Sequence, residues 1–436
     1  MGAKFLFLRW LVVFSFIVAG ASRAPAQSQG MSSAKVRTPV VFSQLREPTG
    51  AERCQFCHAA EVDGYAGSAM AHSLRRAGQE PDGTVTVDDS RITMHSASNG
   101  YWQQLESGGE ITNYRIDYVI GSGKHAAGYL LDLGGHLFQS PVAYYNSRHA
   151  YGLAPGYEKV PHPDFTRPIS EACLFCHSGS ALKIQGTSNA YRSAPFSAET
   201  ITCERCHGSV EQHLRDPRAD TIVNPAKLEA AARDSICEQC HLLGAGRVLN
   251  PGKKFSDFEA GQRLEDVFTT YRDVPPQGAA PGEKFKVISH VEQLARSACA
   301  RQSNGKLWCG TCHDPHQQPV DPIGYFRSKC LSCHAQKLPA AHPGRESNCI
   351  GCHMPRRDAK DGGHTAFTDH RIQRHPEQEE SVSADTEIAA WREPASEFQK
   401  RNLGIAYVNV GMERRSLALI GSGYRMLTGG SGPIRQ

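Results

Sequence analysis

The chain has 436 residues, of which 39% are apolar, and 41 glycines and 25 prolines are spread along it. Glycine and proline bury little apolar side-chain surface, so a large hydrophobic core built by the chain alone is excluded. The formal net charge is only +4 at pH 7, which lacks the strongly basic character of a nucleic-acid-binding protein. The 15 cysteines are the unusual feature of the composition.

The first 26 residues are typical of a secretory signal peptide. A basic start precedes an apolar run from Trp10 to Ala21, and Ala24 and Ala26 offer small residues at a cleavage site. The run is shorter than the roughly 20 residues that cross a bilayer, and no later stretch is apolar enough to do so. We expect residues 1–26 to be removed and the protein to be exported, to the periplasm or beyond, with no membrane span after cleavage. An uncleaved anchor is the alternative.

Seven copies of the pattern CxxCH follow, and they use 14 of the 15 cysteines. Two cysteines three positions apart lie on one turn of chain, so both sulfurs can reach the two vinyl groups of one haem, and the next histidine is placed under the iron as its proximal ligand. A zinc ribbon or a thioredoxin-like CxxC is the alternative, but neither requires a histidine after every second cysteine. The sequence therefore predicts seven covalently attached haems c, held by Cys54, Cys57 and His58; Cys173, Cys176 and His177; Cys203, Cys206 and His207; Cys237, Cys240 and His241; Cys309, Cys312 and His313; Cys330, Cys333 and His334; and Cys349, Cys352 and His353.

Haem attachment changes the charge of the protein. Loss of Lys4, Arg9 and Arg23 with the signal leaves the mature chain near +1 (4 − 3). With two ionised propionates on each haem and one positive charge on each ferric porphyrin, the oxidised protein is about −6 (1 − 7) and the reduced protein about −13 (1 − 14). A nucleic-acid partner therefore has no support. Cys299, the one cysteine outside a motif, is interpreted as a small buried thiol, with a role as an iron ligand as the alternative.

The organisation of the chain follows from the motif positions. After a mobile N-terminal segment at 27–52, we expect a seven-haem domain at 53–376 that is mainly α and irregular, with much of its core supplied by the porphyrins. Residues 84–151 hold no cysteine and alternate between polar and apolar, as at 111–120, and Gly134-Gly135 is a hairpin signal. This stretch predicts a small antiparallel β insertion between the first and second haems.

The end of the chain has a different composition. Residues 377–395 are polar and acidic and are interpreted as a linker. Residues 396–436 carry apolar residues at helical spacing and partly match the first helix and turn of a tetratricopeptide repeat, with an ordinary amphipathic helix as the alternative. We expect a C-terminal helical segment, a possible protein-binding element that is dispensable for haem binding.

Distal ligands for seven irons can come from the 13 histidines outside the motifs. Only six methionines remain in the mature chain, and Met354 lies directly beside a proximal histidine, so histidine should dominate. Any one of the candidates could instead be a surface histidine or bond a propionate. His364 is a reserve for His370. The candidates are His72, His125, His213, His290, His316, His342 and His370, and the unassigned histidines are His95, His136, His149, His162 and His375.

The motifs resemble those of multihaem c-type cytochromes, the group that includes hydroxylamine oxidoreductase, pentahaem nitrite reductase and tetrahaem electron carriers. The resemblance covers roughly residues 50–375, and it extends to exported proteins with haem motifs in front and tetratricopeptide repeats behind. It implies a haem-dominated fold and redox chemistry but does not define an activity. It rests on the CxxCH motifs, on His213 behind the third motif, on His316 behind the fifth, on Met354 and Pro355 behind the seventh, and on the stretch from Phe367 to Ile372.

Three functions are consistent with the sequence. The first is a periplasmic electron carrier that passes electrons between redox protein partners through mostly bis-histidine haems. The second is an oxidoreductase that acts on a small nitrogen or sulfur compound at one open haem, and the third is a scaffold for a repeat domain. Related nitrite reductases often use a CxxCK site, which does not occur here, and histidines exceed the irons, so the carrier is favoured. No catalytic residue is predicted.

Overall fold

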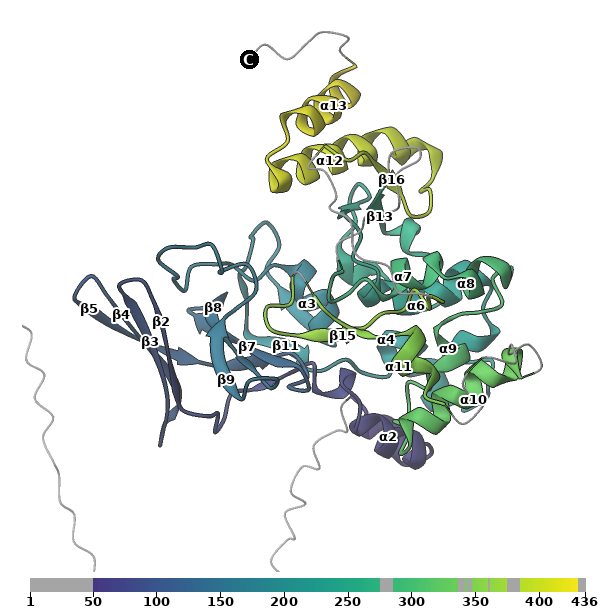
Figure 1. The fold of residues 1–436 in the computed structure, drawn as a ribbon, viewed down its shortest axis with the longest axis horizontal. Helices are drawn as coiled ribbons and strands as arrows, with labels where there is room; N and C mark the ends of the chain where they lie inside the picture. The colour runs from purple at the N-terminus through teal and green to yellow at the C-terminus, as the bar shows by residue number, and fades with distance from the viewer. Residues whose placement is uncertain are drawn as a thin grey trace, which may run out of the picture. The chain divides into compact units, whose positions relative to one another are not determined.

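The computed structural model describes residues 50–274, 285–335, 342, 347–359, 361–374 and 385–429 (Figure 1). The predicted signal peptide, nearly all of the predicted N-terminal segment, and His375 lie outside the described residues. Within these ranges, no helix has the length and apolar character needed to cross a bilayer.

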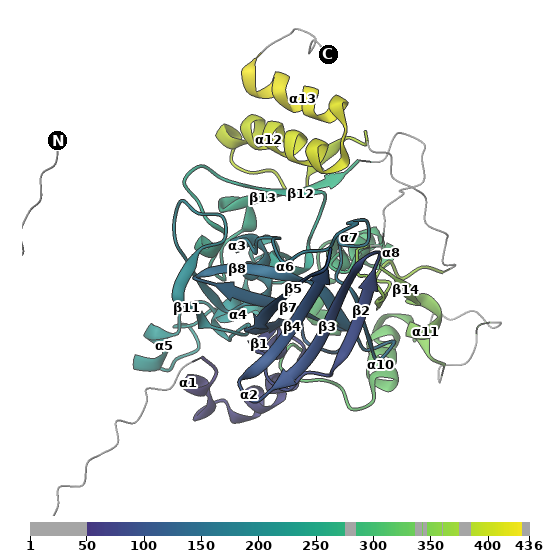
Figure 2. The same ribbon diagram turned by 90° about the vertical axis from the view of Figure 1, so that its left-hand side faces the viewer.

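An antiparallel β unit lies between the first and second haem motifs, as the alternating sequence predicts. It is larger than predicted, because it runs from residue 74 to residue 153 and forms two sheets, with strand orders β2-β3-β4-β5 and β1-β6-β7-β8-β9. The four-stranded sheet faces the viewer in Figure 2. The strands are β1 (Leu74–Arg76), β2 (Gly83–Val87), β3 (Ser90–Ala97), β4 (Gly100–Ser107), β5 (Glu110–Ile116), β6 (Tyr118–Ile120), β7 (Ala126–Leu133), β8 (His136–Tyr145) and β9 (Ala150–Leu153).

The β unit has an apolar core made by its own chain. Strands β7 and β8 turn at Gly134 and Gly135, whose φ angles of 63° and 88° suit the tight turn of a two-residue hairpin. Residues from both sheets then form one cluster of buried side chains. Its members include Ile92, Met94, Tyr101, Ile116, Val119, Tyr129, Leu131 and Val142.

The haem motifs overlap short helices, and all but the first of these helices end at or beside the proximal histidine. Residues i and i+3 share one face of a helix, so both cysteines of a motif point to the same side. Where the helix ends at or beside the histidine, the imidazole can point in a different direction from the cysteines. These helices are α1 (Glu52–Gln55), α3 (Glu171–His177), α4 (Glu204–His207), α6 (Ala230–His241), α9 (Cys309–Cys312), α10 (Pro322–His334) and α11 (Cys349–His353).

Short elements join these helices. Three of the helical ones, α5, α7 and η1, carry histidines outside the motifs, and the strands form two-stranded antiparallel ladders, β10 with β11 and β14 with β15. The elements are α2 (Ala59–Ala66), α5 (Glu211–Arg215), α7 (His290–Arg296), α8 (Ala298–Gln302), the 3₁₀ turns η1 (Met70–His72), η2 (Pro225–Lys227), η3 (Phe255–Asp257) and η4 (Leu264–Asp266), and the strands β10 (Ser180–Lys183), β11 (Tyr191–Ala198), β14 (Arg356–Asp358) and β15 (Ala366–Thr368).

Several haem-motif helices have no protein core beneath them. Helix α10 is well started, because Asp321 caps the backbone N–H of Gly324 and Pro322 occupies its first turn. None of its 13 residues is buried, and α1, α2, α9 and α11 also bury none of their residues. A short helix without a buried face is not stable in water by itself, so these helices need a further surface to pack against.

The C-terminal segment joins the haem region through a sheet. Strands β12 (Gly246–Leu249), β13 (Phe268–Asp273) and β16 (Ile388–Ala390) pair in that order. Helices α12 (Ser396–Arg414) and α13 (Leu417–Thr428) then pack together as a hairpin (Figure 1). The contact is tight where Gly404 faces Gly423, because a Cβ on Gly423 would lie 2.5 Å from the Gly404 carbonyl oxygen. The helical segment that the sequence predicts is thus present as one helical hairpin, and its likeness to a tetratricopeptide repeat stays a prediction.

The described end of the predicted linker is part of the fold. Beside β16, Trp391 donates a hydrogen bond to Glu238 at 3.2 Å, and Arg392 bonds Glu238 and Glu265, each at 2.9 Å. Glu238 stands between the two cysteines of the fourth motif and is buried. The described end of the predicted linker is therefore packed against the fold, because the Arg392 cation neutralises two buried carboxylates. That the C-terminal segment is dispensable for haem binding stays a prediction.

Replacing Arg392 tests this link between the C-terminal segment and the fourth motif. The change Arg392→Gln removes the cation from Glu238 and Glu265, and we expect the free energy of unfolding to fall by roughly 2–3 kcal/mol. Denaturant unfolding of the holoprotein measures it. Arg218→Gln, which breaks an exposed ion pair with Asp216, is the control and should change stability by less than about 1 kcal/mol. Equal effects of the two changes would contradict the proposed role of Arg392.

Candidate haem sites

The separation of two imidazole rings tests whether an iron fits between them. An imidazole nitrogen binds a metal at about 2.0–2.1 Å, and the ring centroid lies roughly 1.1 Å behind it, so rings on opposite sides of one iron have centroids about 6.3 Å apart. Rings stacked in direct contact are closer than this, so a separation near 6 Å leaves room for a metal.

Four proximal histidines face a second histidine at this separation. The ring centroids of His58 and His213 lie 6.2 Å apart. In each of the four pairs, the two ring planes are inclined to each other by no more than 30°. Each partner is one of the predicted distal candidates. His213, His316 and His370 are distant in sequence from their proximal histidines, and His342 follows the sixth motif but faces the proximal histidine of the seventh. The other pairs are His207 with His316 at 5.8 Å, His313 with His370 at 6.1 Å, and His353 with His342 at 6.1 Å.

Hydrogen bonds orient these histidines for metal binding. The Nδ1 atom of His207 lies 2.8 Å from the Val223 carbonyl oxygen, and that of His353 lies 2.9 Å from the Gln373 carbonyl oxygen. His213 and His370 make the same kind of contact, with carbonyl oxygens at 3.0 and 2.9 Å. An acceptor on Nδ1 fixes the tautomer that leaves the Nε2 lone pair for a metal. Burial also lowers the pKa of His207, His313 and His370, which keeps them neutral.

The fourth motif lies in a cluster of histidines. The ring centroids of His241 and His290 lie 5.4 Å apart, and those of His290 and His370 lie 4.8 Å apart. Burial, followed by the neighbouring histidines, lowers the pKa of His290 to about 2, and its Nδ1 is buried without a hydrogen-bond partner. His125 lies beside this cluster, with its ring 4.5 Å from that of Phe367. The structure thus brings the distal candidate His290 against the proximal His241, with a second candidate, His125, on the side of His290 that faces Phe367.

The remaining site residues are not paired. Among the described residues, no second imidazole packs against His177 of the second motif or His334 of the sixth. The candidate His72 lies exposed at the end of η1 and makes no ring contact with a described histidine. The reserve His364 lies against Tyr145, with ring centroids 5.0 Å apart, and not against His313.

Thiols of different motifs lie side by side, which shows how the motifs follow one another in space. Burial and the adjacent Cys54 raise the pKa of Cys203 to about 12. Charge interactions also link Cys206 to Cys237 and Cys312 to Cys333. The motifs therefore run in the order one, three, four, five, six, seven, with the second beside the fourth. The thiols whose pKa values are shifted by a neighbouring thiol of another motif include Cys54 with Cys203, Cys176 with Cys240, Cys237 with Cys309, and Cys330 with Cys349.

Some residues that position the histidines carry no motif and were missed in the sequence. Gln293 stands one turn after His290 in α7, accepts a hydrogen bond from the backbone N–H of His370 at 2.8 Å and donates to Ser289 at 2.6 Å. It therefore ties two distal candidates together. Only the buried Asp369–Arg371 pair could have been found from the sequence. It lies in the stretch from Phe367 to Ile372 that resembles multihaem cytochromes.

Comparison with known proteins finds similarity to multihaem cytochromes. No family model matches the chain. It is 25% identical over 192 residues to the multiheme cytochrome MtrA of Shewanella baltica, which covers 41% of this chain and 57% of that protein. It is 21% identical over 368 residues to the dissimilatory sulfite reductase MccA of Wolinella succinogenes, covering 70% of this chain and 50% of that protein. It is 23% identical over 198 residues to the nine-heme cytochrome c of Desulfovibrio desulfuricans, covering 43% of this chain and 55% of that protein. The chain thus spans about half the length of these relatives. The crystal structure of the outer cell wall cytochrome OcwA aligns with 74% of this chain and 79% of its own, at 15% identity and a TM-score of 0.46.

Seven CxxCH motifs, imidazole pairs at the separation of axial ligands, and relatives that are multihaem cytochromes define the class of this protein. The chain is a multihaem c-type cytochrome.

Removal of one distal histidine tests the pairing. His213→Ala should leave the iron held by His58 without its sixth ligand, and we expect one equivalent of high-spin ferric haem by electron paramagnetic resonance. His162→Ala is the control, because His162 is an exposed histidine whose contact is with Asp89; its spectrum should match that of the unchanged protein. An entirely low-spin spectrum for His213→Ala would refute the pairing of His58 with His213.

Proposed function

We propose that the chain is an exported heptahaem cytochrome that carries electrons between redox protein partners. The observation that carries this proposal is the set of four imidazole pairs at 5.8–6.2 Å. When bound, haem c supplies a one-electron centre at each motif. Two histidines of the chain would hold the iron at most of the sites, and such sites would have no position for an exogenous ligand.

The arrangement of the motifs supports the same role. Thiols of successive motifs are close enough to shift one another's pKa values, so the sites form one connected series with a single branch at the fourth motif. A carrier needs closely spaced sites from one end to the other. Two imidazoles per iron give a lower reduction potential than a histidine–methionine pair, and closely spaced charges spread the potentials further. We therefore expect low and widely spread reduction potentials.

A second function has one observation in its favour. His177 and His334 have no imidazole opposite them among the described residues, and a site with one axial ligand binds small molecules. His334 adjoins residues outside the described ranges, whereas residues 50–274 around the second motif are described without a gap. The second motif is therefore the better place for an open haem, and one relative is named a sulfite reductase. The alternative function is an oxidoreductase acting on a small nitrogen or sulfur compound there.

Carbon monoxide separates the two functions. The experiment uses mature holoprotein whose intact mass corresponds to seven haems, and a count of five or fewer would already contradict the proposed sites. An electron carrier with six-coordinate irons should bind less than about a tenth of an equivalent of carbon monoxide when reduced, as measured from the Soret band. Binding of one full equivalent, with a matching high-spin ferric signal, would favour the enzyme instead.

A further inference from the structure

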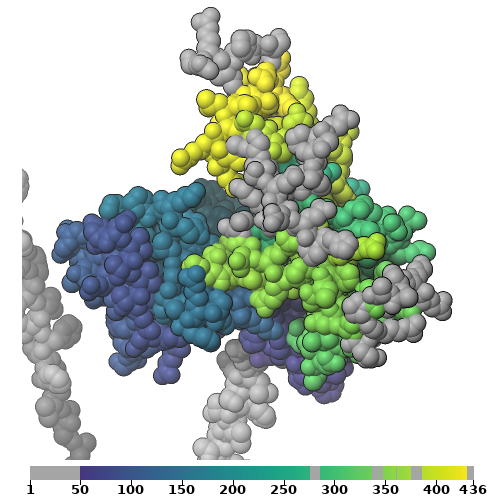
Figure 3. Space-filling view, in the orientation of Figure 1, coloured from purple at the N-terminus to yellow at the C-terminus, as the bar shows by residue number. Residues whose placement is uncertain are grey.

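A cavity of about 620 Å³ lies beside the histidine cluster. Its walls come from two parts of the chain: the connection before β7 and the turn after β8 on one side, and the β14–β15 hairpin on the other. The two walls are bonded together, because Ser147 donates a hydrogen bond to the His364 carbonyl oxygen at 2.8 Å. In Figure 3 the light-green residues of the hairpin segment lie directly against the blue β unit.

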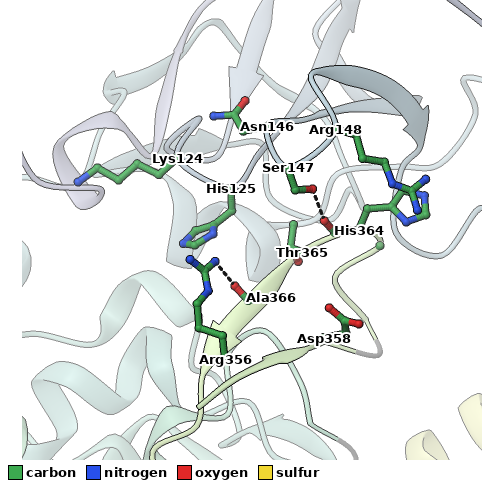
Figure 4. Close-up of a pocket in the computed structure, with 11 residues that line it drawn as sticks. Lys124, His125, Asn146, Ser147, Arg148, Arg356, Asp358, His364, Thr365 and Ala366 are labelled. Atoms are coloured by element: carbon green, nitrogen blue, oxygen red, sulfur yellow. Dashed lines mark hydrogen bonds between the residues drawn. The ribbon is translucent and has the colours of Figure 1, made fainter. Parts of the chain in front are cut away.

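The side chains around the cavity are mostly donors and cations. Lys124, Arg148 and Arg356 line it, and Asp358 is the single carboxylate, so its lining carries +2 (3 − 1) with neutral histidines. Figure 4 shows the His125 ring beside the Arg356 guanidinium, with Lys124 to one side of them. A holoprotein that is negative overall, at about −6 when oxidised, therefore keeps one concave positive site.

Two of the cations are held in place by the backbone. Arg356 donates a hydrogen bond to the Ala366 carbonyl oxygen at 2.7 Å across the β14–β15 ladder, and Lys124 donates to the Gly67 carbonyl oxygen at 3.3 Å. Both groups keep further N–H donors, since a guanidinium has five and an ammonium three. A preorganised fork of donors suits an oxoanion, whereas a metal cation or an apolar ligand has little to bind here.

The cavity is also close to the redox sites. His125 forms part of its wall and contacts Phe367, whose ring centroid lies 6.5 Å from that of His290. One layer of side chains therefore separates the cavity from the histidines that surround the fourth and fifth motifs. Because a negative charge favours the more positive, oxidised state of a nearby centre, an anion in the cavity should be coupled to oxidation.

We propose that this cavity binds a small doubly charged inorganic oxoanion, and that binding is tighter to the oxidised protein than to the reduced protein. The proposal does not depend on whether the protein is a carrier or an enzyme, because it concerns a site beside the haems and not an open iron. Thermodynamic linkage requires the converse as well: the anion should lower the reduction potential of a neighbouring haem.

Calorimetric titration of the holoprotein with sulfate, in a chloride-free buffer of low ionic strength, tests the site. We expect one sulfate per chain. Arg356→Gln and Lys124→Gln should each weaken binding about tenfold or more, since each removes a charged hydrogen-bond donor. Arg91→Gln, which neutralises an exposed arginine on β3 outside the cavity, should leave the affinity within about twofold. Electrochemically reduced protein should bind sulfate more weakly than oxidised protein.

Three results would overturn the proposal. One is the absence of saturable sulfate binding to the unchanged protein. Another is an equal loss of affinity in Arg91→Gln and Arg356→Gln, which would show that only net charge matters. The third is a shift of a reduction potential in Arg356→Gln without any sulfate effect, which would assign these cations to haem propionates instead.

Discussion

The separation of two imidazole rings on either side of one iron is the constraint on which the haem region depends. The chain meets it with histidines that are distant in sequence, such as His58 and His213, so each site joins two segments that otherwise share little packing. The cysteine pair of a motif fixes the haem to one helix, and the distal histidine then ties that haem to another element. Each bound haem thus acts as a cross-link as well as a redox centre.

The protein builds its core in two different ways. The β unit buries its own side chains, including Tyr101 and Tyr129, between two sheets. The haem-motif helices do the opposite, since α10 buries none of its residues and has only its caps to define it. In the proposed haem-dominated core, a flat porphyrin of large apolar area would provide the surface that these helices lack and would order a chain rich in glycine and proline. Between the two parts lies the cationic cavity, where the β unit meets the β14–β15 hairpin.

The sequence predicted the local chemistry better than the architecture. The haem motifs and the Gly134–Gly135 hairpin could be read from residue types and spacing. So could the candidates His213, His316, His342 and His370, each of which lies opposite a proximal histidine, while their role as iron ligands stays a prediction. The pairing of these histidines could not, because it depends on contacts between distant segments. The size of the β unit was underestimated, since β1 lies before the predicted stretch of 84–151 and β9 runs two residues past its end. Arg392 was assigned to a linker because a polar segment gives no sign of a buried acidic partner, and Gln293 belongs to no motif.

The most direct test of this account is hydrogen exchange on the haem-free chain, produced without residues 1–26 in a compartment that does not attach haem c, and compared with the mature holoprotein. The account predicts that amides of β3, β4, β7 and β8 stay protected without haem, because their core is made of side chains. Amides of α10 and α11 should lose protection by at least about a hundredfold relative to the holoprotein. Protection of α10 in the haem-free chain at the level of the holoprotein would contradict the claim that the porphyrins form the core of the haem region.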